Sequence, residues 1–340
     1  MAQRFDAGAL KLVGDPVPIV DAVHMLPAAG LGLFTAADDG ALLYLPPSED
    51  QVSELVLLDR SGAVVDALAR GNLIGAFRLS PDGTTAMGSE SDARTGISDL
   101  WLFDLARHTR SRFTFDPPNE TGALWSPDGR RIAFGSFRDG RWGVFARALA
   151  SSGADETLVM SGGAMVPTSW SPDGRTLIYR NTSATTREDL WLLPLDGDRQ
   201  PRPLLVERFN ENEACFSPDG RWIAYQSTES GQTEIYAMPY PGPGRRSQIS
   251  TEGGFVPQWR GDGLEILYQT ADQKLMAVAV EIVDGVLRTS APQALFGLQD
   301  DAFYDATPDG SRFLVSRPLV QTSQTPPRLV TNWTALIGRH

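Results

Sequence analysis

Acidic and amide side chains gather in four short stretches of this sequence, FDPPNETG, RFNENEA, STEGGF and LQDDAFYD. Seven of the acids in these stretches stand against one base, Arg208, and the seven are Asp116, Glu120, Glu211, Glu213, Glu252, Asp300 and Asp301. Three amides, Asn119, Asn210 and Asn212, stand among them. Carboxylates around one opening focus a negative potential that attracts cations and hydrogen-bond donors. These ten residues, called here the acidic mouth, predict a ligand-binding site; an ordinary solvated face of an acidic protein is the alternative.

Residue types that often carry catalysis are scarce in the chain. The three histidines, His24, His108 and His340, lack the spacing of metal ligands. The single cysteine, Cys215, lies in the apolar stretch NEACFSPDG, which is typical of a buried side chain rather than of a nucleophile. The chain has no G-x-S-x-G motif of a serine hydrolase. We therefore predict no catalytic residue, no metal and no cofactor.

A repeated phrase shows how the acidic loops are positioned. Ser-Pro-Asp-Gly occurs at 80–83, 126–129, 171–174 and 217–220, with weaker copies ending at Gly40, Gly263 and Gly310. The glycines recur at intervals of 43 to 47 residues, the period of a four-stranded blade. Proline presets the second position of a tight turn and glycine takes the left-handed fourth position, so each phrase predicts a hairpin tip. The turn explains Asp82, Asp128, Asp173 and Asp219 without metal or acid–base chemistry.

Short strands surround each turn. The third unit reads TGALW, RRIAFGS, RWGVFAR and DETLVM, and similar third strands recur as DLWLFDL, DLWLLPL and EIYAMPY. Four-stranded antiparallel sheets repeated around an axis form a β-propeller. The sequence predicts an all-β, seven-bladed propeller, with six or eight blades less favoured. In this fold the acidic loops lead into the innermost strands and meet at one end of the central channel.

The ends of the chain suggest how the ring closes. Residues 1–20 align without gaps with residues 276–295, so we predict that 1–22 supply the outer strand of the closing blade. The whole chain is then one domain. Its predicted blades are 23–70, 71–116, 117–161, 162–208, 209–252 and 253–299, with 300–340 as the closing blade.

Charge and hydropathy limit the partners. The chain of 340 residues has 30 basic and 42 acidic residues, a net charge of -12, which argues against nucleic acid and against an anionic membrane surface. No apolar segment approaches the roughly 20 residues that span a bilayer, and the N-terminus lacks the pattern of a secretory signal. We expect no membrane contact by this segment. The sequence indicates neither the localisation nor the oligomeric state.

The motifs also carry a family resemblance. The SPDG turns, the DLW third strands and the run from 194 to 227 resemble the WD-like propeller repeats of the TolB type. Over essentially the whole chain they are most similar to the C-terminal propeller of large bacterial transmembrane serine/threonine kinases. This resemblance implies a segment of a larger protein, with an extracytoplasmic location. Kinase activity is not implied, because the glycine-rich loop and the HRD and DFG motifs are absent from the sequence.

The predicted function is that of a non-catalytic binding module. We expect it to bind a peptide, a protein or a small polar ligand at the acidic mouth, with the sensor domain of a bacterial signalling kinase as the implied context. Two alternatives stay open: a metal-assisted lyase or hydrolase that acts at the mouth of the channel, and a structural scaffold for protein interactions.

Overall fold

The structure is a computed structural model that describes residues 1–23, 25–26, 31–37, 39–46, 52–92, 98–115, 120–150, 153–183, 187–242, 244–299, 302–319 and 326–337. Within these ranges the chain forms antiparallel strands and one short helix, α1 (Thr334–Ile337). No helix of the described ranges is long and apolar enough to cross a membrane. The chain divides into two compact units: unit 1 comprises 1–51, 93–96 and 319–340, and unit 2 comprises 52–92 and 97–318.

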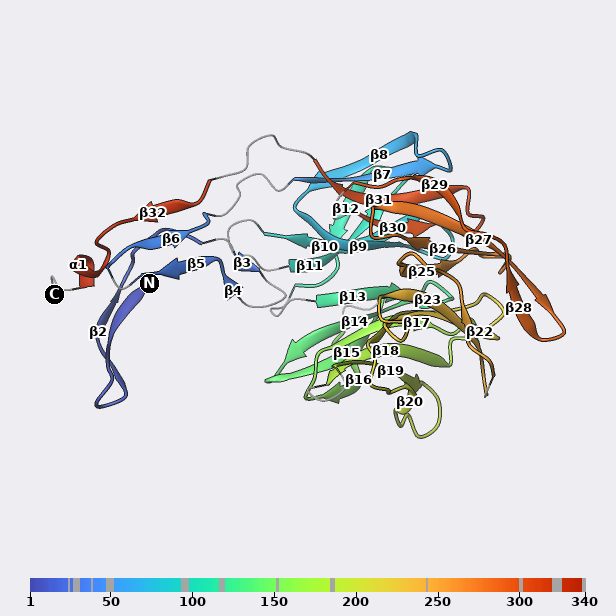
Figure 1. The fold of residues 1–340 in the computed structure, drawn as a ribbon, viewed down its shortest axis with the longest axis horizontal. Coiled ribbons are helices and arrows are strands. Elements are labelled where there is room, and N and C mark those ends of the chain that lie inside the picture. The colour runs from blue at the N-terminus through green and yellow to red at the C-terminus, as the bar shows by residue number, and fades with distance from the viewer. Residues whose placement is uncertain are drawn as a thin grey trace. The chain divides into compact units, whose positions relative to one another are not determined.

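Unit 2 contains five antiparallel sheets of four strands and one of five (Figure 1). The first four are as follows. Sheet 1 contains β9 (Leu73–Leu79), β10 (Thr85–Ser91), β11 (Ser98–Asp104) and β12 (Thr109–Arg112). Sheet 2 contains β13 (Glu120–Trp125), β14 (Arg131–Arg138), β15 (Arg141–Ala148) and β16 (Glu156–Ser161). Sheet 3 contains β17 (Met165–Trp170), β18 (Thr176–Ser183), β19 (Arg187–Pro194) and β20 (Arg202–Leu205), and sheet 4 contains β21 (Glu211–Phe216), β22 (Trp222–Ser227), β23 (Glu234–Pro239) and β24 (Ser247–Gln248).

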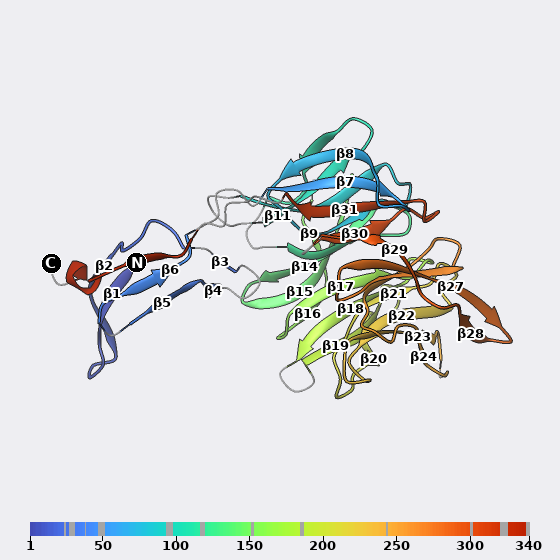
Figure 2. The same ribbon diagram turned by 45° about the horizontal axis from the view of Figure 1, so that its top comes forward.

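The remaining two sheets depart from this regular order. Sheet 5 is β25 (Phe255–Trp259), β26 (Glu265–Gln269), β27 (Lys274–Val283) and β29 (Gln293–Gly297), with β28 (Val286–Thr289) paired to the far half of β27. Sheet 6 joins distant parts of the chain: β30 (Phe303–Ala306) and β31 (Arg312–Pro318) pair with β7 (Ser53–Asp59) and β8 (Val64–Gly71). The blue strands β7 and β8 therefore lie beside the red strands β30 and β31 (Figure 2).

The repeated phrase forms the turn between the first two strands of a sheet. In sheet 2 the Gly129 N–H donates to the Ser126 carbonyl at 2.9 Å, and Asp128 Oδ1 accepts from the Ser126 hydroxyl at 2.6 Å and from the Arg130 N–H at 3.1 Å. These hydrogen bonds, chiefly the one from Ser126, lower the pKa of Asp128. The predicted left-handed glycines are confirmed, with φ of 68° at Gly129, 72° at Gly174 and 69° at Gly220.

The second strand of each sheet lies in the core because the neighbouring sheets cover both of its faces. In β22, WIAYQS, all six residues are buried. One cluster packs Ile178 of sheet 3 against Phe216 and Tyr225 of sheet 4. Burying a large apolar side chain in this way contributes roughly 1.5–3 kcal/mol to folding.

Polar contacts also link the innermost strands of neighbouring sheets. In three places a side chain two residues before a turn accepts a backbone N–H from the next innermost strand. The pairs are Ser169 Oγ with Phe216 at 3.0 Å, Gln258 Oε1 with Ala306 at 3.1 Å, and Asp305 Oδ2 with Leu79 at 2.7 Å. The last two pairs tie sheet 6 to sheets 5 and 1, so the sheets follow one another as in a propeller.

Sheet 6 corrects the predicted closure. Residues 1–22 do not join the C-terminal strands; instead β31 pairs with β7 over seven residues, from Arg312 opposite Asp59 to Pro318 opposite Ser53. The physical reason is the apolar core of β7, SELVLLD, whose four apolar residues, Leu55 to Leu58, are all buried. The count of seven blades is not confirmed, since unit 2 holds six sheets in the described residues.

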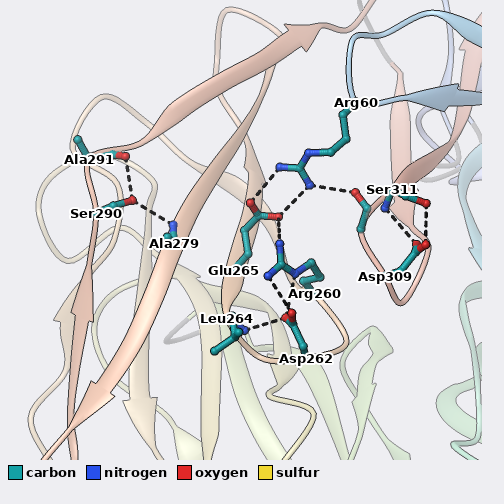
Figure 3. A network of polar contacts seen from close by, with 11 residues as sticks. Arg60, Arg260, Asp262, Leu264, Glu265, Ala279, Ser290, Ala291, Asp309 and Ser311 are labelled. Carbon is teal, nitrogen blue, oxygen red and sulfur yellow. Dashed lines mark hydrogen bonds and ion pairs between the residues drawn. The ribbon is translucent and has the colours of Figure 1, made fainter.

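An ion-pair network holds the end of β7 in place (Figure 3). Arg60 donates to the two Glu265 carboxylate oxygens at 3.0 and 2.9 Å and to the Gly310 carbonyl at 2.9 Å. Arg260 lies 3.5 Å from Glu265 and also binds Asp262 at 2.8 Å. The network joins sheet 5 to the turn of sheet 6.

Unit 1 contains the strands that the prediction assigned to the first and last blades. The hairpin β1 (Ala2–Asp6) and β2 (Lys11–Val17) pairs with itself, as do β3 (Met25–Leu26) and β4 (Leu31–Gly32). A three-stranded sheet has the order β32 (Arg328–Val330), β6 (Leu42–Tyr44), β5 (Phe34–Ala36). Residues 23–70 and 300–340 are therefore each divided between the two units. The likeness of residues 1–20 to 276–295 reflects matching hairpins, since β27 and β28 are joined in the same way as β1 and β2.

Candidate functional site

The structure describes six of the ten residues of the acidic mouth: Glu120, Asn210, Glu211, Asn212, Glu213 and Glu252. Asp116, Asn119, Asp300 and Asp301 lie outside the described residues. These six residues lie in different strands and loops and have different surroundings.

Glu120 is the first residue of β13 and is buried. It accepts a hydrogen bond from the Thr114 hydroxyl at 3.0 Å, and its other oxygen lies 4.0 Å from Arg138. Burial raises the pKa of Glu120 to about 7, and the neighbouring Asp99 acts in the same direction, whereas Thr114 and Arg138 oppose the rise. Arg138 also binds Asp155 at 2.8 Å. Glu120 is thus part of a buried polar network.

Glu211 occupies the same place in β21, where only 1% of the residue is exposed. Neither of its carboxylate oxygens has a hydrogen-bond partner in the described structure. Burial raises the pKa of Glu211 to about 7, and the nearby carboxylates of Glu207 and Asp189 add to the rise. The charge of Arg246 opposes this rise, but Arg246 is itself bound by Glu207 and, at 3.2 Å, by Glu229.

Amide groups beside Glu211 do not supply the missing donors. The Asn210 side-chain oxygen is buried without a partner in the described structure, and so is the Tyr225 hydroxyl. Asn212 donates its amide to Glu188, which is also bound by Arg180 at 2.9 Å. Arginines from outside the acidic loops therefore offset part of the charge at this end of the channel. The predicted ratio of seven acids to one base was counted over the loops alone, and it includes neither these arginines nor the neighbouring acids Glu188, Asp189 and Glu207.

The last two mouth residues lie apart from this group. Glu252 is exposed in the loop before β25. Glu213 sits in a bulge of β21, where the register shifts between Asn212 and Cys215, and it has φ of 46°. There Glu213 lines a cavity together with Pro218 of the following turn, rather than the loop end of the channel.

This central cavity has a volume of about 410 Å³ and is lined by residues from the innermost strands of all six sheets. One contribution from each sheet is the residue two positions before its turn. These six, called here the channel ring, are Arg78, Leu124, Ser169, Cys215, Gln258 and Asp305. Trp125, Trp170 and Trp259 follow the ring residues, and the turn prolines Pro81, Pro127, Pro172, Pro218 and Pro308 surround the opening.

The ring residues are held by contacts between sheets. Arg78 lies 3.6 Å from Asp305 and donates to the Tyr304 carbonyl at 3.3 Å. Burial raises the pKa of Asp305, while Arg78 opposes the rise. The Cys215 thiol donates to the Pro257 carbonyl at 3.1 Å, and burial raises the pKa of Cys215 to about 12. A thiol with so high a pKa is a poor nucleophile at neutral pH, which agrees with the sequence interpretation.

Part of the tryptophan surface packs the sheets together. Trp170 belongs to a core cluster with Leu177 and Leu193. The Trp125 indole N–H donates to the Arg78 carbonyl at 3.1 Å, and the Trp170 indole donates to the Gly174 carbonyl at 3.0 Å. The cavity was not predicted from the sequence. The signal lay in the repeat itself, because the ring position holds a different residue in each sheet, while the turns are nearly constant.

Comparisons with known proteins agree with this architecture. Residues 49–188 match the family described as the TolB beta propeller domain. A TolB of the Tol-Pal system from Anaeromyxobacter dehalogenans is 32% identical over 121 residues, 35% of this chain and 27% of the relative. An uncharacterized protein of Agrobacterium fabrum is 25% identical over 205 residues, 56% of this chain and 67% of the relative. A tricorn protease homolog of Streptomyces coelicolor is 33% identical over 95 residues, 28% of this chain and 8% of the relative.

Solved structures show the same fold at low identity. A putative TolB from Agrobacterium tumefaciens superposes with a TM-score of 0.62 and 18% identity, over 81% of this chain and 100% of that chain. TolB from Acinetobacter baumannii gives 0.55 and 16%, over 88% and 82%. The matched part of this chain spans only 27% of the Anaeromyxobacter relative and 8% of the Streptomyces relative. Residues 49–188 thus resemble the TolB beta propeller domain, and the four-stranded sheets of unit 2 are consistent with the blades of a propeller.

Proposed function

We propose that the chain is a non-catalytic binding module whose ligand, a peptide, a protein segment or a small polar molecule, occupies the central cavity. One observation carries the proposal: residues of all six sheets of unit 2 line a single cavity of about 410 Å³. Pockets that hold small ligands typically measure about 300–1,000 Å³ and combine apolar walls with a few placed polar groups. The tryptophan and proline walls and the channel ring have this composition.

The acidic mouth is the weaker candidate on the described residues. Glu120 and Glu211 are almost fully buried, and Asn212 is engaged by Glu188. Glu213, which the sequence assigned to the mouth, lines the cavity. We therefore place the ligand at the end of the channel beside the SPDG turns. A role for the mouth stays a prediction.

The relatives favour a binding module over one fixed chemistry. They are named for a Tol-Pal system and for a tricorn protease, so the same type of domain serves different proteins, and the function depends on the site rather than on the fold. The metal-assisted enzyme gains no support, since the described residues hold no group of three potential metal ligands. The sensor role in a signalling kinase remains an expectation from the resemblance, and the comparisons do not support it.

A matched pair of substitutions in sheet 3 tests the proposed site. Thr168→Phe places a ring in the cavity wall, whereas Thr182→Phe adds the same ring at an exposed position of β18. The probe is a panel of small cationic, anionic, zwitterionic and neutral polar compounds and short peptides, with binding measured by calorimetry. We expect at least one class to bind the wild type and Thr182→Phe and to lose affinity for Thr168→Phe. Equal binding to both variants, or no binding by any member of the panel, would contradict the proposal.

A further inference from the structure

We infer that the ligand of the central cavity is an organic cation with an apolar body, such as an alkylammonium group or a lysine or arginine side chain. This inference rests on the proposed function and names the chemical class of ligand for the same cavity. It follows from the charges in the wall, from the backbone at Glu213 and from the aromatic surface.

The charged side chains in the cavity wall are Arg78, Asp305 and Glu213. Arg78 and Asp305 form an ion pair at 3.6 Å, and Asp305 also accepts the Leu79 N–H at 2.7 Å. Glu213 makes no hydrogen bond or ion pair with the residues that the structure describes. One carboxylate is therefore left to meet a ligand, and it favours a positive group over a negative one.

The backbone at Glu213 gives a second, independent reason. Bulges occur at the matching place in other innermost strands, where Gly75 with φ of 69°, Gly122 with φ of 59° and Val256 with φ of 53° are also in the left-handed region. Glu213 adopts φ of 46°, which a residue with a Cβ rarely takes. Strained positions of this kind cluster at functional sites, and a bulge re-aims a side chain. Here the strained residue carries the unpaired carboxylate of the cavity.

The rest of the wall suits the apolar body of such a cation. Trp125 and Trp259 are half-buried in the cavity wall, and their ring carbons are the aromatic surface available to a ligand. Trp170 is 8% exposed and has the Arg131 guanidinium 5.8 Å from its ring centroid. Tryptophan faces attract ammonium and guanidinium groups, and this attraction increases when water is excluded. Five turn prolines complete the apolar rim. A small inorganic cation would leave these faces without contact, and an anion would meet Glu213.

Choline and its neutral carbon analogue, in which a tert-butyl group replaces the trimethylammonium group, are the probes. The two have the same shape and differ in charge. We expect choline to bind the wild type at least about tenfold more tightly than the analogue, which is the effect of about 1.4 kcal/mol. Choline affinity should also fall as salt is added, because screening weakens exposed charge attraction.

Three variants of the full chain locate the charge. Glu213→Gln should weaken choline about tenfold while leaving the analogue unchanged. Glu213→Gly removes the same carboxylate and places glycine at a left-handed position, so it guards against a folding defect; it should weaken choline to the same extent without lowering the melting temperature. Glu252→Gln, which removes an exposed carboxylate outside the cavity wall, is the matched control and should bind choline as the wild type does.

The outcomes separate the two proposals. Equal affinity for choline and the analogue, or unchanged choline binding by both Glu213 variants, would overturn the cationic class while leaving the cavity as a ligand site. If only anionic or neutral compounds of the panel bind, and Thr168→Phe weakens their binding, the cationic class would likewise be overturned while the cavity stays a ligand site. If no compound binds the wild type, the proposed function itself fails.

Discussion

Replacing Glu211 by glutamine is expected to stabilise the protein, and the gain should depend on pH. Only 1% of Glu211 is exposed, and its two carboxylate oxygens lack hydrogen-bond partners in the described structure. An ionised carboxylate in such a place loses its hydration without compensation. Glutamine keeps the shape and removes the charge.

The magnitude follows from the pKa of Glu211, which burial raises from 4.5 to about 7. In the unfolded chain the group ionises near 4.5, whereas the folded chain holds the proton up to about 7, so folding takes up a proton between these values. Stability from this group is complete below pH 4.5 and is lost as the pH rises to about 7. The loss amounts to about 3 kcal/mol, because each unit of pKa is worth about 1.4 kcal/mol.

Urea denaturation from pH 5 to pH 8, followed by tryptophan fluorescence, measures this difference. Near pH 5 the wild type and Glu211→Gln should have similar midpoints. At pH 8 the variant should be more stable by about 3 kcal/mol, a midpoint shift of about 1 M for a slope of about 3 kcal/mol per M. Glu120, whose pKa is also raised to about 7, is present in both proteins and cancels from the difference. Glu252→Gln serves as the exposed control.

Two results would refute this reasoning. A difference that does not change with pH would mean that the Glu211 carboxyl is not perturbed by burial. A variant that is less stable than the wild type at pH 8 would mean that the ionised carboxylate has a partner, such as a bound cation, which the described residues do not supply.

Three further predictions concern the fold. Gly129→Val should cost roughly 1–2 kcal/mol in the free energy of unfolding, because φ is 68° there, whereas Gly162→Val, at a glycine with open space around its Cβ position, should cost less; equal losses would argue against the left-handed turn. Glu213→Gly should raise that free energy by about 1 kcal/mol by relieving the left-handed backbone, and a decrease would show that the residue is not strained. Leu55→Ala in β7 should lower the free energy of unfolding by about 2–5 kcal/mol because Leu55 is fully buried, whereas deleting residues 1–22 should leave the unfolding of unit 2 unchanged. If the deletion destabilises unit 2 and Leu55→Ala does not, the N-terminal strand closes the ring as the sequence predicted.

Local chemistry made the turns predictable from the sequence. The hydroxyl of Ser126 and the carboxylate of Asp128 form their contacts within six residues, so the phrase specifies its own structure. The apolar strands beside each turn were predictable for the same reason, since alternation and β-branched residues are local properties. Four-stranded sheets follow from repeating that pattern.

Strand pairing across the whole chain could not be predicted in this way. By sequence, either β7 or the region of β32 could pair with β31 as the third strand of sheet 6. The pairing depends on which of the two strands packs its apolar side chains against Phe313 and Val315. Pairing of Arg312 with Asp59 joins residues that are far apart in the sequence. The position of Glu213 was also hidden, because a bulge shifts the side chains that follow and so moves a residue from the predicted mouth to the cavity wall.

The repeat supplies an internal reference for deciding which residues serve function rather than architecture. At the first position of the innermost strand, sheets 1, 3 and 5 have Leu73, Met165 and Phe255, whereas sheets 2 and 4 have Glu120 and Glu211. At the bulge, sheets 1 and 2 have glycine, whereas sheets 4 and 5 have Glu213 and Val256, with φ of 46° and 53°. An apolar residue in place of Glu211 would avoid the cost of removing a carboxylate from water. A glycine in place of Glu213 would avoid the strain of a left-handed backbone. Positions where a sequence departs from the residue that favours stability, with no structural gain, indicate function. Sheet 4 departs twice within three residues, at Glu211 and at Glu213.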